Sequence, residues 1–206
     1  MQRLLLVLLL LTLSIYSSSC DKSSKSTKTS VWLPQAPYST DPLDFDNLFH
    51  HIVFYSVFSP LVTEYKTGTV TGVIAESWTS SEDFTKWSFK IRADLKFSNG
   101  DSITSEVVLL SLKRILYLLK MRNSQNSVVE NILGIEKFNK LSNELPGLVL
   151  NNKDNSSEIV FTFTKPVKNL LSLISFGMYS IVHPSLYDKT TGKWLDKMKS
   201  ISSAAY

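Results

Sequence analysis

The sequence has little that suits covalent cross-linking, metal clustering or disorder. Its 206 residues include a single cysteine, which excludes a disulfide framework and any Cys-x-x-Cys metal motif. Seven glycines and seven prolines are too few for a collagen-like or proline-rich chain. The apolar fraction of 43% is ordinary for a globular protein, so we do not expect a wholly disordered chain.

The sequence also has only a small net charge. The chain has 22 Lys+Arg and 18 Asp+Glu, a net charge of +4, and no run of five or more basic residues. Nucleic-acid-binding surfaces concentrate positive charge, so no nucleic-acid partner is predicted. Motifs of the G-x-S-x-G, H-E-x-x-H, P-loop and G-x-G-x-x-G types are missing, and the sequence therefore predicts neither an enzyme nor a bound cofactor.

The N-terminus holds the one long apolar run. Arg3 supplies a positive charge, and residues 4–13 read LLLVLLLLTL. This run is shorter than the roughly 20 residues that a membrane-spanning helix needs. It is typical of the apolar region of a secretory signal, so residues 1–19 are predicted to be a signal peptide.

The only cysteine, Cys20, follows three small residues, 17–19. This arrangement resembles a bacterial lipoprotein signal. The resemblance implies that Cys20 becomes the new N-terminus and carries a diacylglycerol, which would anchor the protein to the membrane of the cell envelope, facing the periplasm or the exterior. Ordinary signal cleavage beside an incidental cysteine is the alternative. Residues 20–30 would then be a lipidated, flexible tether, because residues 22–30 contain no apolar side chain.

The body from residue 31 is predicted to be β-rich with interleaved helices, a mixed α/β (α+β) class. Residues 87–92 alternate strictly, which places Trp87, Phe89 and Ile91 on one face of a strand. Asn99-Gly100 predicts a tight turn. Further strands are expected at 31–33, 61–65, 70–73 and 158–164.

Helices are predicted at 48–58, 105–120, 128–141 and 169–175. Thr104 is a suitable N-cap for the second of them. The helix at 128–141 is expected to be broken or kinked near Gly134, and the polar residues 151–157 predict a turn. The helix at 105–120 carries an apolar stripe made of Val108, Leu112, Ile115, Leu116 and Leu119.

A series of ordered motifs carries a family resemblance. The chain resembles the extracellular solute-binding proteins of the oligopeptide/dipeptide type, solute-binding family 5, which are the binding subunits of peptide ABC importers. The resemblance covers nearly all of residues 31–206, and several ordered matches are more specific than any one of them. The matching segments are Pro42-Leu43-Asp44, Phe58–Leu61, Ala75-Glu76-Ser77-Trp78, Trp87–Arg92, Leu95–Asp101, Ile103–Val107, Phe161–Phe163 with Lys165-Pro166, and Ser202–Tyr206.

The resemblance implies a type II periplasmic-binding-protein-like fold, in which a solute lies between two lobes. The resemblance implies that residues 31–58 are the first segment of lobe I and that residues 59–180 form a small, β-rich α/β domain inserted into it. In residues 181–206 the chain would return toward lobe I, which stays incomplete. The second lobe would be absent, so we expect a truncated chain. Whether the truncation is natural, a frameshift or a sequencing fragment is open at this point.

The implied function is a substrate-binding lipoprotein subunit for peptide import, with an oligopeptide or dipeptide as solute, ABC permease subunits as partners and a monomeric state. A degenerate surface lipoprotein or interaction module without solute binding is the alternative. Nickel, haem or an oligosaccharide is not excluded as the solute.

Five residues are candidates for the cleft. Asn47, His50 and His51 would lie on its first wall, and Tyr179 and His183 near the return of the chain. Adjacent histidines point apart on a helix, and no third ligand lies nearby in the sequence. No metal site is therefore predicted.

Overall fold

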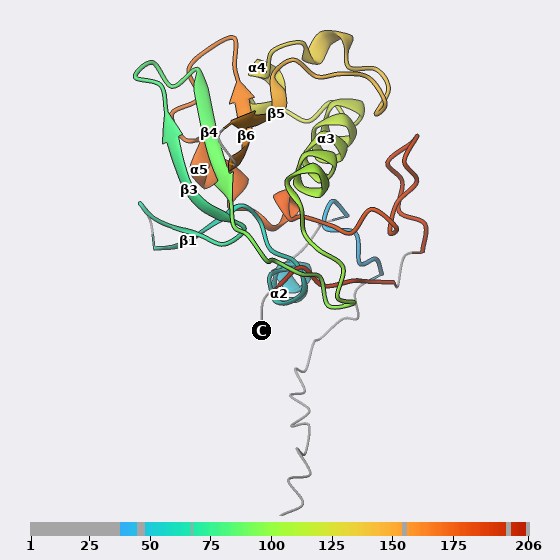
Figure 1. Cartoon of the computed structure of the whole chain (residues 1–206). Helices are drawn as coiled ribbons and strands as arrows, with labels where there is room; N and C mark the ends of the chain where they lie inside the picture. Colours follow the sequence, from blue (N-terminus) through green and yellow to red (C-terminus); the bar gives the residue numbers. More distant parts are fainter. Residues whose placement is uncertain (1–37, 45–47, 67, 154–155, 197–198, 205–206) are drawn as a thin grey trace, which may run out of the picture. The chain divides into compact units, whose positions relative to one another are not determined.

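The computed structural model describes residues 38–44, 48–66, 68–153, 156–196 and 199–204. Residues from Pro34 to Tyr206 belong to one compact unit. The described part is a mixed α/β structure, which confirms the predicted fold class (Figure 1). No helix among the described residues is long and apolar enough to cross a membrane.

Two antiparallel sheets hold the strands. β1 (Val62–Lys66) and β2 (Thr69–Gly72) form a two-stranded hairpin. The larger sheet has the order β3-β4-β6-β5 (Figure 1). Its strands are β3 (Ala75–Ser80), β4 (Lys86–Ile91), β5 (Leu148–Lys153) and β6 (Ser156–Thr162).

An aromatic core lies on the inner strands of the larger sheet. Trp87, Phe89 and Ile91 are buried on one face of β4, as the alternation predicts. Phe89 meets Phe161 of β6 edge to face, with ring centroids 5.7 Å apart, and Phe161 stacks on Phe163 at 6.1 Å. These contacts bury large apolar surfaces, and the contact between Phe89 and Phe161 helps to hold β4 and β6 in register.

Helix α3 (Ser105–Met121) packs against β5 and β6 (Figure 1). The hydroxyl of Thr104 accepts a hydrogen bond from the N–H of Val107, at 3.4 Å, so Thr104 is the predicted N-cap. The predicted apolar stripe is confirmed as the buried face of the helix, made of Val108, Leu112, Ile115, Leu116 and Leu119.

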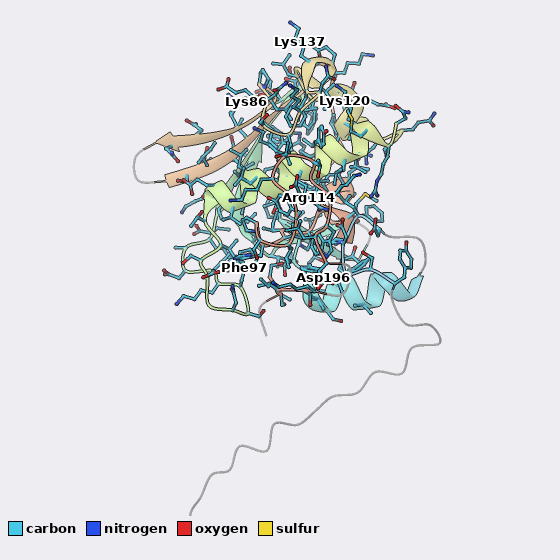
Figure 2. The ribbon with its side chains drawn as sticks, turned by 90° about the vertical axis from the view of Figure 1, so that its right-hand side faces the viewer. Lys86, Phe97, Arg114, Lys120, Lys137 and Asp196 are labelled. Carbon is cyan, nitrogen blue, oxygen red and sulfur yellow. The ribbon has the colours of Figure 1, made fainter. Side chains whose placement is uncertain are left out.

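Arg114, on the same helix, is buried among packed side chains (Figure 2). Its Nη2 lies 2.5 Å from Oδ2 of Asp41, and its Nε donates to the carbonyl of Gly192 at 2.7 Å. The guanidinium lies over the rings of Tyr187 and Trp194, 5.0 and 5.1 Å from their centroids. One side chain thus joins α3 to segments from both ends of the described chain.

The helix predicted at 128–141 is interrupted before Gly134, as expected, but its predicted extent is wrong. α4 spans only Ser127–Asn131, and a short 3-10 turn, η1 (Ile135–Lys137), follows it. α4 ends because Ile132 is extended and pairs with Phe163, and Gly134, with φ of 82°, then precedes η1 in a left-handed conformation. The ammonium of Lys120 donates to carbonyls of this turn, the shortest contact being 2.6 Å, and so stabilises the non-helical path.

The predicted turn at 151–157 is also too wide. β5 continues to Lys153 and β6 begins at Ser156, because the two strands pair up to the end of their hairpin. The hydroxyl of Ser157 donates to Asn152 Oδ1 at 2.7 Å across this pair. Polar residues here extend a hairpin whose inner part is fixed by burial in the core.

The remaining predicted elements match more closely. α2 (Leu48–Val57) and α5 (Leu170–Ile174) lie where helices are expected, and η2 (Gly177–Tyr179) follows α5. The predicted strand at 31–33 lies outside the described residues. The predicted domain boundaries at 58/59 and 180/181 stay predictions.

Candidate functional site

A cavity of about 490 Å³ opens between the C-terminal end of α2, strand β1 and the end of the described chain. Most of its lining is apolar or aromatic, as in many sites that bind small molecules. The lining residues are Tyr55, Phe58, Ser59, Pro60, Thr63, Glu64, Tyr65, Val73 and Ala204. We call this cavity the α2–β1 pocket.

A hydrogen-bonded junction beside the pocket joins three segments that are far apart in sequence. The hydroxyl of Ser203 donates to the carbonyl of Ile181 at 2.7 Å and accepts the N–H of Ser59 at 2.9 Å. The N–H of Ile181 donates back to the carbonyl of Ser59 at 2.9 Å. These buried polar groups satisfy one another, so the junction holds the wall formed by Ser59 in place.

Residues 202–204 of this junction also cap the C-terminal end of α2. The Val57 carbonyl at the helix end accepts the Ser202 hydroxyl at 2.6 Å and the N–H groups of Ser203 and Ala204 at 3.1 and 3.2 Å. The last carbonyls of a helix have no partner within the helix, and residues 202–204 supply one here. Ala204 is thereby placed on the pocket wall.

Strand β1 forms the opposite wall. It has a strand neighbour, β2, on one side, and the described residues place no strand on its other side. A bulge between Glu64 and Lys66 leaves Tyr65 without an opposite residue, and the Tyr65 side chain is 78% exposed. Bulges of this kind redirect side chains, and here Glu64 and Tyr65 both contribute to the lining.

Glu64 is the charged group of the pocket. Its Oε1 accepts the N–H of Gly68 at 2.8 Å. This bond, together with the Ser172 hydroxyl, holds the pKa of Glu64 below its ordinary value. The carboxylate is therefore ionised at neutral pH, and it gives an otherwise apolar pocket a negative charge.

Tyr55 lies on the helix wall of the pocket. It is 43% exposed, and its hydroxyl donates to the carbonyl of Ser175 at 3.1 Å. Burial of part of the ring raises the pKa of Tyr55, so the phenol stays neutral.

Four of the predicted site residues have no described side chain. Cys20 and Asn47 lie outside the described residues. His50 and His51 fall in α2, but only their backbone is described, and position 51 precedes Tyr55 by one helical turn. Their place in a cleft stays a prediction. No group of three or more His, Cys, Asp or Glu side chains that could hold a metal ion occurs in the described part of the chain.

Tyr179 and His183 lie away from the pocket lining. Tyr179 is 1% exposed, and burial raises its pKa. His183 accepts the N–H of Ser185 on Nδ1 at 3.2 Å, so its Nε2 donates to Asp101 at 2.9 Å. Its ring meets Phe97 edge to face at 4.9 Å, which fixes the turn around Asn99-Gly100.

Sequence reasoning missed Tyr55, Glu64 and Tyr65 as pocket residues. The pattern at 61–65 shows a strand, but it does not show that the strand bulges or lacks a second neighbour. The wall formed by Ala204 depends on contacts with Val57 across 147 positions of sequence, and no local signal reports such a contact.

Comparison with known proteins gives consistent matches. The family model described as bacterial extracellular solute-binding proteins, family 5 Middle, matches residues 69–206. The periplasmic oligopeptide-binding protein OppA of Haemophilus influenzae is 28% identical over 177 residues, which are 82% of this chain and 31% of that protein. The crystal structure of Haemophilus influenzae OppA in complex with RPPGFSPFR superposes with a TM-score of 0.56 at 25% identity, covering 73% of this chain and 29% of that one.

A shorter match concerns a different solute. The nickel-binding periplasmic protein of Escherichia coli is 40% identical over 60 residues, which are 29% of this chain and 12% of that protein. The chain thus spans at most about a third of the length of these relatives. Because the family model covers two thirds of the sequence, the chain belongs to the bacterial extracellular solute-binding proteins of family 5.

Proposed function

We propose that this chain is a substrate-binding subunit of an ABC transporter that imports peptides, or a part of such a subunit. Membership of solute-binding family 5 supports the binding role, and the relatives are binding proteins rather than enzymes. The similarity to an oligopeptide-binding protein, one structure of which contains a peptide, supports a peptide as the solute.

The observation that carries the proposal is the position of the α2–β1 pocket beside β1. A strand with a neighbour on one side offers N–H and C=O groups to an extended peptide, and such strand addition recognises main chain irrespective of side chains. The aromatic and apolar lining next to that edge supplies a place for one side chain of the peptide.

Native mass spectrometry of the chain with a mixture of tri- and tetrapeptides tests this function. The expected result is a set of complexes with peptide masses and no complex with the free amino acids. A parallel sample with Ni²⁺ tests the solute of the nickel-binding relative. Complexes with Ni²⁺ but with no peptide would contradict the proposal.

We further propose that Cys20 carries a lipid that anchors the protein to the membrane of the cell envelope, where it delivers solute to ABC permease subunits as a monomer. The N-terminal apolar run and the small residues before Cys20 support this. Metabolic labelling with an alkyne fatty acid in a bacterial host should label the wild type but not Cys20→Ala. Equal labelling of both proteins would contradict the anchor.

The alternative is an interaction module in which only residues 59–180 are folded. The buried junction of Ser203 with Ser59 and Ile181 argues against it, because it joins residues outside that range to the rest of the unit. Limited proteolysis distinguishes the two: we expect protection throughout 38–204, whereas a protected core confined to 59–180 would favour the alternative.

A further inference from the structure

The α2–β1 pocket contains one charged residue among its described lining, Glu64. Three other carboxylates of the described chain have cationic partners: Asp41, Asp44 and Glu76 pair with Arg114, Arg122 and Lys90. Within the described residues Glu64 forms no ion pair, and no lysine or arginine lines the pocket. Its negative charge therefore faces the cavity without compensation from the lining.

The Glu64 carboxylate is also held in place. The N–H of Gly68 donates to its Oε1 at 2.8 Å, across the turn that joins β1 to β2. Gly68 has φ of 84°, which the turn requires and which glycine adopts without strain. An oriented carboxylate loses less conformational entropy when it binds a partner than a freely rotating one.

Three aromatic residues line the same cavity as this charge. Tyr55, Phe58 and Tyr65 line the same cavity, and the bulge in β1 brings Tyr65 and Glu64 to it from successive positions. The face of an aromatic ring attracts cations, and it does so more strongly where water is partly excluded. An acid among aromatic rings is a combination that suits an ammonium or guanidinium group better than a neutral or anionic one.

We infer that the α2–β1 pocket selects peptides with a cationic side chain, lysine or arginine, and that Glu64 determines this specificity. The inference rests on the proposed function, in that the ligand is a peptide whose main chain lies along β1. Its cationic side chain enters between Tyr55 and Tyr65 and ends at the Glu64 carboxylate.

A matched pair of peptides tests the selection. Ala-Lys-Ala and Ala-norleucine-Ala have the same main chain and differ in the terminal ammonium of one side chain. By calorimetry, we expect the lysine peptide to bind about fivefold more tightly, the sum of one partly exposed ion pair and one cation–π contact. Glu64→Gln should remove this preference. Glu82→Gln, which removes an exposed charge outside the pocket, should retain it.

A second probe separates this inference from the proposed function. n-Butylammonium should shift the amide NMR signals of Glu64 and Tyr65 saturably, n-butanol should not, and Glu64→Gln should abolish the effect. If no peptide binds but n-butylammonium shifts these signals and Glu64→Gln abolishes the shift, the cation site stands and the peptide function fails. If both peptides bind equally and n-butylammonium causes no shift, the peptide function stands and the cation site is overturned. Absence of both kinds of binding overturns both.

Discussion

Arg114 and Asp41 form an ion pair, with 2.5 Å between Nη2 and Oδ2, in which both side chains are at most 4% exposed. The pair joins residues 73 positions apart, and Asp41 also accepts the N–H of Leu43 at 3.1 Å. The ion pair attaches the segment 38–44 to α3. Arg114 also donates to the carbonyl of Gly192, which attaches the C-terminal part of the described chain to α3. Removing one partner leaves the other charge buried.

Asp41→Asn should therefore lower the free energy of unfolding by about 3–5 kcal/mol, the usual effect of breaking a buried pair. Urea denaturation followed by tryptophan fluorescence measures this. The matched control is Asp44→Asn, because Asp44 pairs with Arg122 at 3.2 Å in a more exposed setting. It should cost no more than about 1 kcal/mol. Equal effects of the two substitutions would argue against a buried pair.

Phe161→Ala tests the aromatic core. Phe161 is fully buried between Phe89 and Phe163, so truncation leaves a cavity and should cost about 3–5 kcal/mol of unfolding free energy. Val149→Ala on the neighbouring strand, where the side chain is 41% exposed, should cost less than about 1 kcal/mol. Thermal or urea unfolding compares them, and a small effect of Phe161→Ala would contradict the packing.

Ser203→Ala tests the junction that supports the pocket. The substitution leaves the N–H of Ser59 and the carbonyl of Ile181 without their buried partner, which should cost about 1–3 kcal/mol. Hydrogen exchange at Ser59 should become faster by a corresponding factor. Ser80→Ala, at an exposed position of β3, should change neither quantity. Unchanged exchange at Ser59 in Ser203→Ala would contradict the junction.

The loop at 188–193 should respond to acid. The carboxylate of Asp188 accepts the N–H of Thr191 at 2.7 Å, its hydroxyl at 2.9 Å, and the N–H of Thr190 at 3.0 Å. These bonds hold the pKa of Asp188 below its ordinary value of 3.8. Because the folded pKa is lowered, the stabilisation is present above pH 3.8 and is lost as the pH falls through the lower folded value. An NMR titration of Asp188 with a midpoint at or above 3.8 would contradict this.

Elements with a strong local pattern were predictable from the sequence. Strand β4 and helix α3 each have a repeating apolar pattern whose period matches their geometry, and burial follows that period. The helix predicted at 128–141 shows the limit, because α4 ends at Asn131, where Ile132 pairs with Phe163 through a contact made only after the chain has folded back.

The candidate site was less predictable than the fold. Its walls come from α2, β1 and Ala204, which meet only through the Ser203 junction. The exposure of Tyr65 depends on a bulge, and the charge of Glu64 matters because of its neighbours in space. The family motifs identify the fold, since they lie largely in its core and turns, whereas Tyr55, Glu64 and Tyr65 of the pocket lie outside them.

Calorimetric titration of the chain with Ala-Lys-Ala tests the central claim most directly, when wild type is compared with Tyr65→Ala and Leu195→Ala. Both side chains are largely exposed, at 78% and 65%, so both variants should fold, but only Tyr65 lines the pocket. The account predicts saturable binding, weakened about tenfold in Tyr65→Ala and unchanged in Leu195→Ala. No binding by the wild type, or equal binding by all three proteins, would contradict a peptide site at the α2–β1 pocket.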